Sequence, residues 1–486
     1  MRVISIDLGA SSGRCMMMKL TEGNKLEIEE LHRFDNGIYH QDNHDCWDLD
    51  TLWQEVLTGI EKSFKRYNDI VSIGVDSWAV DFVCLDKEDN EIRPFVSYRD
   101  SRTQGCLSQF CEQYGIQPQD IFTTTAAQLL EINSLYQLFA LKKNNPELFE
   151  RINQILMIPD WFHFKLTGLK STEFTNASTT QMLEAKTKNW CPQICVYLGL
   201  KASQLPQIYQ AADCLGELKK DICETLGIQQ KVTVTLPATH DTASAVVSVP
   251  SEEKNPYFIS LGTWAVVGRE NNYFDVNPQN IKLKIGNEGG VFNTYRRTKN
   301  VIGLWLIQNV RKELCPDMSY GDIVKEAINY PMGESLVFPN DNLFLNPQLM
   351  HEAIIEFCQR TEQSTPQTIG AFARCIFDSL ACSLADTLDE IAQKQSLEKV
   401  YVIGGGAQNH FLCQSLADIL GVEVSVGPYE ATAIGNGVMQ LIGQGVIADI
   451  IQARKIIKES FDCLSFKPQN NLQGLRQQYH YIVEKI

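Results

Sequence analysis

Val3-Ile4-Ser5-Ile6-Asp7-Leu8-Gly9-Ala10-Ser11-Ser12-Gly13-Arg14 joins the pattern of a strand to that of a turn. The β-branched residues favour a strand, and alternation places Ser5 and Asp7 on the face opposite Ile4 and Ile6. Gly9 and Gly13 then bracket two hydroxyls in a turn whose N–H groups and side-chain oxygens suit phosphate oxygens. The simpler alternative is an ordinary β-hairpin turn.

Asp7 stands just before this turn and would repel a phosphate group. A divalent cation between the carboxylate and the phosphate resolves that conflict, so Asp7 is the candidate metal ligand. Arg14 adds a positive charge on the far side of the turn. The sequence therefore predicts a phosphate-binding turn that also holds a metal ion.

A partial repeat of this strand-turn pattern occurs about half a chain later. Residues Tyr257 to Trp264 read Tyr-Phe-Ile-Ser-Leu-Gly-Thr-Trp, again an apolar strand, then Leu-Gly, then a hydroxyl. Two such units suggest a duplicated domain in which each half contributes a phosphate-binding turn. The second copy has no aspartate, so only the first half is expected to hold the metal.

Length and charge restrict the class of protein. The 486 residues favour two large domains, because a single core seldom serves so long a chain. With 43 Lys and Arg against 59 Asp and Glu, the net charge of −16 argues against nucleic acid or an anionic membrane as partner. No apolar run approaches the roughly 20 residues of a membrane span, and the chain enters a strand without a leader, so we expect a cytoplasmic enzyme.

The fifteen cysteines have irregular spacing and do not form a zinc pattern. Most are expected to be buried thiols. Cys358 and Cys375 are candidates for a bridge, although a reducing compartment argues against one.

The first half begins as a predicted meander, with strands over 16–20 and 25–34 joined by a turn at 22–24. Residues 49–67 have helical spacing, and residues 70–85 read as strand, turn and strand. Such a meander followed by helix and strand is typical of a ribonuclease H-like half-domain. The polar stretch 248–255 is the expected domain boundary.

The second half contains a long helix predicted over 368–394, followed by a strand over 400–403 that ends in Gly404-Gly405-Gly406. A further helix is expected from about Ala431. Neither glycine cluster completes Gly-x-Gly-x-x-Gly, and the chain has no Gly-x-x-x-x-Gly-Lys-Ser/Thr, which disfavours Rossmann and P-loop folds. Two phosphate turns and a glycine-ended strand instead resemble the actin and sugar-kinase ATPase superfold, with nucleotide in a cleft between the halves.

Asp241 is the candidate general base. It follows a strand predicted over 232–236 and opens a helix, so its carboxylate is expected at a helix N-terminus. The helix dipole there is expected to lower its pKa and keep it ionised. The alternative is a plain N-cap aspartate.

An ordered set of motifs over nearly the whole chain resembles the FGGY family of carbohydrate kinases, and specifically its branch acting on L-rhamnulose. The motifs are Asp7 to Arg14, Gly74-Val75-Asp76-Ser77-Trp78, Tyr98-Arg99-Asp100, His240 to Ala245, Gly262-Thr263-Trp264, Asn287-Glu288-Gly289-Gly290, Lys299 to Trp305, Gly404 to Asn409 and Glu430 to Asn436. Each is weak alone, whereas their order is specific.

The resemblance implies an α/β protein with two ribonuclease H-like domains of the actin/hexokinase ATPase type and an interdomain cleft. Residues 1–248 would form the sugar-binding domain and residues 249–486 the nucleotide-binding domain. The implied reaction transfers the γ-phosphoryl group of ATP, with Mg²⁺, to the 1-hydroxyl of L-rhamnulose. Small-molecule substrates are the implied partners.

The motif match also implies roles for individual residues. Asp241 would accept the proton and Asp7 would bind the metal. ATP would contact Ala10, Ser11, Ser12, Gly13, Arg14, Thr263, Gln308 and Gly405. The sugar would contact Ala79, His240, Thr242 and Asn300.

One departure from the family pattern leaves the identity of the sugar substrate undecided, because Ala79 stands where the family usually has glycine. L-Fuculose and D-xylulose are the alternative substrates. A non-catalytic, nucleotide-dependent binding protein of the same superfold is the alternative function. Because the two predicted phosphate-binding turns lie on separate halves, we also expect the halves to close when sugar binds.

Overall fold

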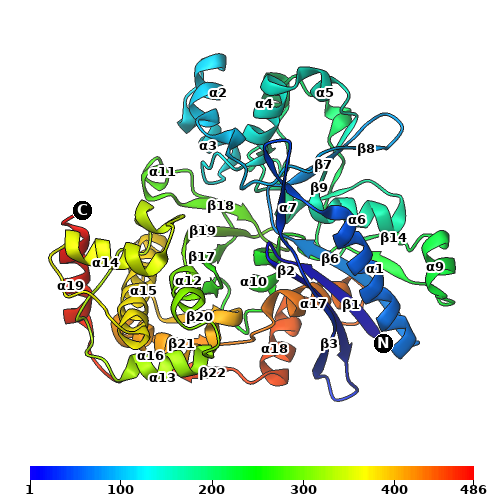
Figure 1. Cartoon of the computed structure of the whole chain (residues 1–486). Coiled ribbons are helices and arrows are strands. Elements are labelled where there is room, and N and C mark those ends of the chain that lie inside the picture. Colours follow the sequence, from blue (N-terminus) through cyan, green and yellow to red (C-terminus); the bar gives the residue numbers. More distant parts are fainter. Residues whose placement is uncertain (394) are drawn as a thin grey trace. The chain divides into compact units, whose positions relative to one another are not determined.

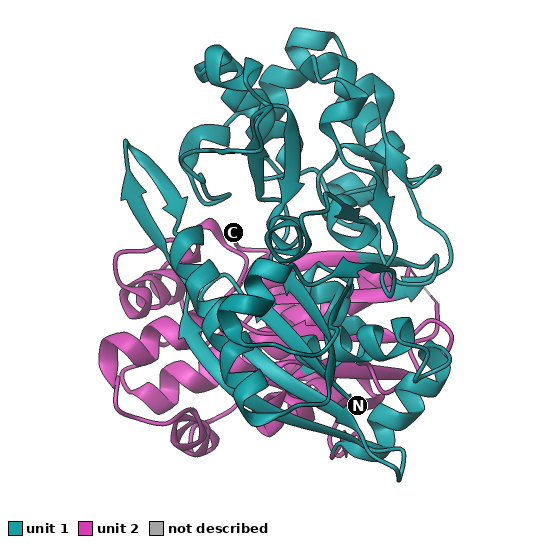
Figure 2. Ribbon diagram, turned by 90° about the vertical axis from the view of Figure 1, so that its right-hand side faces the viewer, with its two compact units in different colours: residues 1–248, 270–297, 431–461 teal, residues 249–269, 298–430, 462–486 magenta. Residues whose placement is uncertain are grey.

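The computed structural model describes residues 1–393 and 395–486 and divides into two compact units (Figures 1 and 2). Unit 1 comprises Met1–Ser248, Glu270–Arg297 and Ala431–Phe461. Unit 2 comprises Val249–Arg269, Thr298–Glu430 and Asp462–Ile486. Each unit is therefore assembled from segments that are separate in the sequence.

The opening stretch forms the central strand of the unit 1 sheet. β1 (Arg2–Leu8) pairs antiparallel with β2 (Ser12–Leu20) and parallel with β6 (Ile70–Ser77). The full order is β14-β15-β6-β1-β2-β3, with β3 (Leu26–Asp35), β14 (Cys214–Glu217) and β15 (Thr233–Thr235). The predicted meander is thus confirmed.

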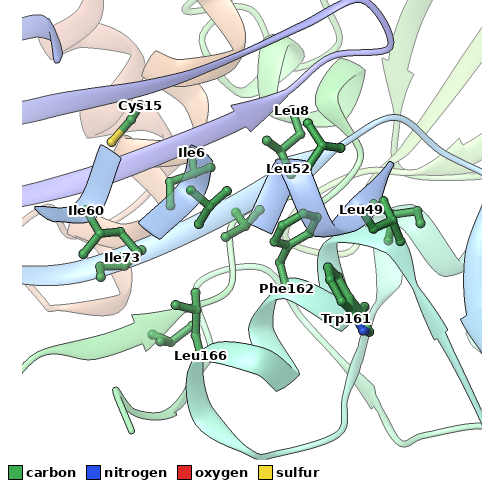
Figure 3. Packing of buried hydrophobic residues seen from close by; sticks show 14 of the residues in the cluster. Ile6, Leu8, Cys15, Leu49, Leu52, Ile60, Ile73, Trp161, Phe162 and Leu166 are labelled. Atoms are coloured by element: carbon green, nitrogen blue, oxygen red, sulfur yellow. The ribbon is translucent and has the colours of Figure 1, made fainter. Parts of the chain in front are cut away.

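One face of this sheet is covered by α1 (Leu49–Arg66) and α6 (Ile158–Thr167). Asp48 caps α1 by accepting a hydrogen bond from the Thr51 N–H, and the helix buries an apolar stripe. Figure 3 shows this stripe packed between the sheet and α6, with labelled side chains Ile6, Leu8, Cys15, Leu49, Leu52, Ile60, Ile73, Trp161, Phe162 and Leu166. The helix predicted over 49–67 is therefore confirmed.

The helices α10 (Asp241–Val247) and α17 (Ala431–Gly443) pack against each other, and α17 also packs on β1 and β6. Their contact is close, because a Cβ on Gly435 would lie 1.7 Å from the backbone oxygen of Ser244. Only glycine allows the two backbones to approach this far. The close fit fixes α10, and with it the position of Asp241.

The rest of unit 1 contains a second, mostly helical core around Phe110, Tyr136 and Phe139. Its sheet has the order β8-β7-β9, with β7 (Phe82–Leu85), β8 (Glu91–Ile92) and β9 (Gln154–Met157). The helices around it are α2 (Cys106–Tyr114), α3 (Pro118–Thr125), α4 (Ser134–Asn144), α5 (Pro146–Glu150) and α8 (Pro192–Leu198).

Short elements complete unit 1. These are the hairpin β4 (Ile38–Gln41) and β5 (His44–Trp47), the pairs β10 (Thr172–Glu173) with β13 (Ile208–Tyr209) and β11 (Leu183–Glu184) with β12 (Asn189–Trp190), the strand β18 (Gly286–Gly289), and the helices α7 (Phe174–Ala177), α9 (Lys220–Leu226), α11 (Gln279–Leu283) and α18 (Ile450–Ser460).

The sheet of the second half has the order β18-β19-β17-β16-β20-β21-β22. The strands are β16 (Tyr257–Leu261), β17 (Trp264–Asn271), β19 (Tyr295–Ile302), β20 (Lys399–Ile403), β21 (Glu423–Val426) and β22 (Leu464–Phe466). The helices of unit 2 are α12 (Trp305–Leu314), α13 (Tyr320–Ile328), α14 (Met350–Arg360), α15 (Ile369–Ala392), α16 (His410–Leu420) and α19 (Gln473–Val483). The long helix predicted over 368–394 is α15, and position 394 lies outside the described residues.

The two sheets repeat one topology. β16 pairs antiparallel with β17 and parallel with β20, as β1 pairs with β2 and β6. The orders β21-β20-β16-β17-β19 and β15-β6-β1-β2-β3 correspond strand by strand. The duplication inferred from the two strand-turn motifs and the ribonuclease H-like fold of each half are therefore confirmed.

Among the described residues no cysteine forms a disulfide, so the suggested Cys358–Cys375 bridge is wrong. Eleven of the cysteines are buried, and Cys358 and Cys375 are joined by a side-chain hydrogen bond. Among the described residues, no helix combines the length and apolarity that a membrane crossing requires.

Candidate active site

The turn after β1 is a β-hairpin connection that leaves its hydroxyls accessible. The Gly9 N–H donates to the Ser12 carbonyl at 2.9 Å, and the Asn36 side-chain amide donates to the Gly9 carbonyl at 2.8 Å. Ser11 is exposed, and Ala10 and Ser12 are half-buried. The β-hairpin turn is therefore confirmed, and phosphate binding by the same turn stays a prediction.

Gly13 has a packing role. It is buried, and a Cβ there would lie 2.2 Å from the ring of Phe34. The adjacent Arg14 forms an ion pair with Asp7, with Nε and Nη2 at 2.8 and 2.7 Å from Oδ2. The side chains on either side of the turn are therefore already oriented by each other.

Asp241 lies next to the ends of β1 and β6. Asp7 on β1 is the register partner of Asp76 on β6, and Ser77 forms a parallel bridge with His240. The charge of Asp7 acts on Asp241, and the charges of both act on Asp76. The fold therefore brings together three carboxyl groups that are far apart in the sequence.

The two oxygens of the Asp241 carboxylate have different surroundings. Oδ1 accepts hydrogen bonds from the N–H and the hydroxyl of Thr242, the latter at 3.1 Å, and lies 3.3 Å from Nε2 of His240. Among the residues that the structure describes, none donates a hydrogen bond to Oδ2. The side chain is 31% exposed, so Oδ2 is the oxygen available to accept a proton.

The pKa of Asp241 is raised, which corrects the sequence-based expectation of a lowered value. Burial is the largest cause and the Asp7 charge adds to it, while His240 and Thr242 act in the opposite direction. Solvent at the exposed third of the side chain screens part of this effect. The dipole of the seven-residue α10 is outweighed by desolvation.

Asp76 is completely buried beneath this site. Its Oδ2 accepts a hydrogen bond from the Asn436 amide on α17 at 2.6 Å, and its Oδ1 has no partner among the described residues. Burial, followed by the Asp7 charge, raises the pKa of Asp76 well above its ordinary range. Asp76 thus links α17 to the strand ends that support Asp7.

A Mg²⁺ ion fits the chemistry of these groups. No cluster of three His, Cys, Asp or Glu side chains suited to holding a metal occurs among the described residues. Mg²⁺ does not need one, because it is usually bound by one or two carboxylates together with water and substrate phosphates. The oxygen donors of Asp7 and Asp76, one of them an unpartnered buried oxygen, match that preference.

The loop that carries Asp241 is held by residues that the sequence analysis did not identify. Glu173 is fully buried, and its Oε2 accepts hydrogen bonds from the N–H and the hydroxyl of Thr239, at 3.0 and 2.9 Å. The Thr175 hydroxyl accepts a hydrogen bond from the His240 N–H at 3.2 Å. These contacts span about 65 residues of sequence, so no local pattern could have predicted them.

His240 faces a second buried group, formed by Arg296 on β19 and Glu288 on β18. Arg296 Nη2 lies 3.0 Å from His240 Nδ1 and 2.9 Å from Glu288 Oε2. Burial would raise the pKa of Glu288, but the Arg296 charge and His240 lower it to about 2. Glu288 belongs to a motif quoted above, whereas nothing in the sequence marked Arg296 as part of the site.

Ala79, the predicted sugar contact, lies in a tightly held turn. It is half-buried between β6 and β7, and the next residue, Val80, has φ +67°, which is unusual for a β-branched residue. The Val80 carbonyl accepts hydrogen bonds from Ser134 and Gln137. The turn therefore has little freedom to adjust around a ligand.

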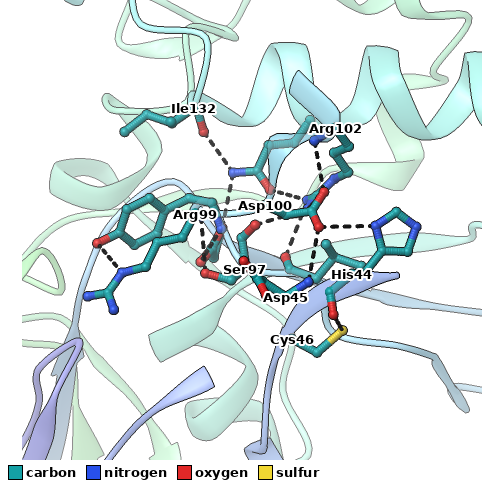
Figure 4. A network of polar contacts seen from close by, with 12 residues as sticks. His44, Asp45, Cys46, Ser97, Arg99, Asp100, Arg102 and Ile132 are labelled. Carbon is teal, nitrogen blue, oxygen red and sulfur yellow. Dashed lines mark hydrogen bonds and ion pairs between the residues drawn. The ribbon is translucent and has the colours of Figure 1, made fainter. Parts of the chain in front are cut away.

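Asp81 and Asp100 organise the aromatic and polar residues beside that turn. Buried Asp81 accepts hydrogen bonds from the indoles of Trp47 and Trp78, at 2.6 and 3.0 Å. Figure 4 shows Asp100 in contact with His44, Asp45 and Arg102, and the Arg102 guanidinium donating to the Ser97 carbonyl. Trp78 is thus a buried core residue.

Unit 2 brings together three of the predicted ATP contacts. The turn at Gly262-Thr263 follows β16, and Gly405 follows β20, its parallel neighbour. The Thr263 carbonyl accepts hydrogen bonds from the N–H groups of Gly303 and Trp305, at the start of the helix α12 that carries Gln308. Gly405 is exposed, and so is Asn300, the predicted sugar contact on β19.

Comparison with known proteins agrees with this architecture. The model of the N-terminal domain of the FGGY family of carbohydrate kinases matches residues 2–248, and the model of its C-terminal domain matches residues 257–443. The rhamnulokinase of Oceanobacillus iheyensis is 40% identical over 465 residues, covering 95% of this chain and 97% of that protein. The rhamnulokinase of Bacillus subtilis is 37% identical over 468 residues, covering 96% and 95%.

Solved structures support the fold. A ligand-bound xylulose kinase from Lactobacillus acidophilus superposes with a TM-score of 0.81 at 17% identity, covering 99% of this chain and 96% of that one. Plasmodium falciparum glycerol kinase with ADP gives a TM-score of 0.77 at 15% identity, covering 100% and 98%. With both domain models matched and close relatives aligned over almost the full length, the chain belongs to the FGGY family of carbohydrate kinases.

Proposed function

We propose that this kinase transfers the γ-phosphoryl group of ATP to the 1-hydroxyl of L-rhamnulose, giving L-rhamnulose 1-phosphate and ADP. The observation that carries the chemistry is the Asp241 carboxylate, with one oxygen occupied and the other available beside Asp7. The choice of sugar rests on the relatives named rhamnulokinase, which align with nearly the whole chain.

In this proposal Asp241 Oδ2 accepts the proton of the attacking hydroxyl. A carboxylate with a raised pKa is a stronger base than an ordinary aspartate. Asp7 would hold Mg²⁺, which neutralises phosphate charge when bound. Arg14, paired with Asp7, would orient that carboxylate and face the phosphates.

The proposed contacts are divided between the two units. Ala10, Ser11, Ser12, Gly13 and Arg14 on unit 1, and Thr263, Gln308 and Gly405 on unit 2, would contact ATP. Ala79, His240 and Thr242 on unit 1 and Asn300 on unit 2 would contact the sugar. The assignment of sugar binding to residues 1–248 and nucleotide binding to 249–486 stays a prediction. An ATP-consuming enzyme whose described cysteines form no disulfide fits a reducing, cytoplasmic compartment.

A panel of ketoses tests the substrate. ADP release would be measured with L-rhamnulose, L-fuculose and D-xylulose at matched enzyme concentration, and kcat/KM compared. We expect L-rhamnulose to have the highest value. Equal or higher kcat/KM with another ketose would remove the assignment of the sugar while leaving the kinase chemistry intact.

Replacement of the base tests the mechanism. Asp241→Asn keeps the size of the side chain and the hydrogen bonds to Oδ1 but removes the proton acceptor, so we expect kcat to fall by about 10²- to 10⁴-fold. ATP affinity, measured by calorimetry, should change little. Sugar-dependent ADP release at the wild-type rate would show that Asp241 is not the base.

A further inference from the structure

The imidazole of His240 is contacted at both nitrogens by groups of fixed hydrogen-bonding character. Nδ1 lies 3.0 Å from Arg296 Nη2, and Nε2 lies 3.3 Å from Asp241 Oδ1. A guanidinium can only donate hydrogen bonds, and a carboxylate can only accept them. Nδ1 is therefore the acceptor in this pair, and the ring proton belongs on Nε2.

Arg296 cannot turn away from this contact. The side chain is 1% exposed, its Nε donates to the Gly289 carbonyl at 2.9 Å, and its Nη2 also donates to Glu288 Oε2 at 2.9 Å. Gly289 and Glu288 belong to β18, and Arg296 belongs to β19. The strands of unit 1 thus hold the guanidinium against Nδ1.

Glu288 could instead favour the tautomer of His240 that is protonated on Nδ1. Its Oε2 lies 3.4 Å from His240 Nδ1 and would accept a hydrogen bond if Nδ1 carried the proton. That tautomer would place an Arg296 N–H against an N–H of the ring, and would turn the lone pair of Nε2 toward the Asp241 carboxylate. Both contacts would be repulsive, and Arg296 is the nearer group.

We propose that Arg296 is a positioning residue that holds His240 in the tautomer protonated on Nε2. The Nε2–H then faces Oδ1 of Asp241 and leaves Oδ2 as the oxygen that accepts the proton of the sugar hydroxyl. The effect on turnover rests on the proposed function, whereas the tautomer does not depend on any substrate.

Nitrogen NMR of the whole protein tests the tautomer directly. Protein labelled with ¹⁵N-histidine would be recorded without sugar or nucleotide, and the His240 signals assigned by their loss in His240→Gln. In wild type we expect the shift of a protonated nitrogen for Nε2 and of an unprotonated nitrogen for Nδ1. In Arg296→Met we expect the two shifts to exchange, because Nδ1 can then donate to Glu288.

Kinetics test the consequence for catalysis. We expect Arg296→Met to lower kcat about 10-fold or more with unchanged ATP affinity, and Arg296→Lys, which keeps a donor, to recover part of that loss. Arg297 is the matched control, since it is the next residue on β19, is also buried and pairs instead with Asp275 and Asn280. Arg297→Met should leave the His240 shifts as in wild type.

Two results would overturn the proposal. One is a wild-type His240 protonated on Nδ1, a measurement that needs no variant and stands even if Arg296→Met fails to fold. The other is an Arg296→Met protein that folds and keeps the wild-type shifts. If wild-type protein had the expected His240 tautomer but no activity toward L-rhamnulose, that result would count against the proposed substrate alone.

Discussion

Asp160 is a single buried residue whose ionisation affects the stability of unit 1. It is completely buried beside Glu173, its Oδ1 accepts a hydrogen bond from the Glu173 N–H at 3.3 Å, and its Oδ2 has no partner among the described residues. Burial, followed by the Glu173 charge, raises the pKa of Asp160 well above its ordinary value. The folded protein therefore holds this proton more tightly than the unfolded chain does.

The sign of the pH dependence follows. A raised pKa of an acid stabilises the folded state fully below the unfolded value, near 4, and this contribution is lost as pH rises toward the folded pKa. Between pH 5 and pH 8 we expect the free energy of unfolding to fall in wild type more than in Asp160→Asn, whose neutral amide mimics the protonated acid. Urea unfolding at both pH values measures the difference.

Asp86→Asn is the control for this measurement. The pKa of half-buried Asp86 is lowered, chiefly by the Asn90 N–H, so it lies below the tested range. Its replacement should shift the stability equally at pH 5 and pH 8. If the free energy of unfolding changed equally with pH in wild type and in Asp160→Asn, Asp160 would carry no proton in the folded protein.

At the scale of elements, the packing of α17 on α10 determines where the candidate base lies. A Cβ on Gly435 would meet the Ser244 backbone, which cannot move aside as a side chain can. We expect Gly435→Ala to destabilise the protein by about 2–3 kcal/mol, since overpacking outweighs the gain in helix propensity. Urea unfolding measures this loss.

Gly437→Ala on the same helix is the matched variant. A Cβ there would lie 2.7 Å from the Met18 side chain and 2.9 Å from the Ser5 hydroxyl oxygen, and both are side-chain atoms that can shift more easily than backbone. Its effect should stay within about 1 kcal/mol of wild type. Equal stability of the two variants would contradict a close backbone contact between α10 and α17.

Elements that depend on neighbours in the sequence were predicted well, and those that depend on distant contacts were not. The meander and the helix α1 follow from local alternation and four-residue spacing. Glu173 and Arg296 reach the Asp241 loop across 66 and 56 residues, so no pattern marked them. The pKa of Asp241 was predicted in the wrong direction because the helix N-terminus is visible in the sequence, whereas burial and the Asp7 charge are not.

At the scale of the whole molecule, the proposed ATP and sugar contacts come from both units. A ligand that contacts residues of both units can bind fully only when both units reach it. Water must also be excluded from the γ-phosphate of ATP. We therefore expect the radius of gyration from X-ray scattering to decrease when sugar and a non-hydrolysable ATP analogue are added together. An unchanged radius at saturating ligand would contradict domain closure.

Unit 1 is not complete until late in the chain, because its last segment is Ala431–Phe461. During synthesis on the ribosome, β1, β6 and Asp241 emerge long before α17, the helix that packs against them. Until α17 is synthesised, one apolar face of the sheet in the nascent N-terminal half stays exposed. We expect chaperones to bind this state. A premature stop anywhere before residue 431 would leave that face bare, so truncated products are expected to be degraded rather than to bind sugar on their own.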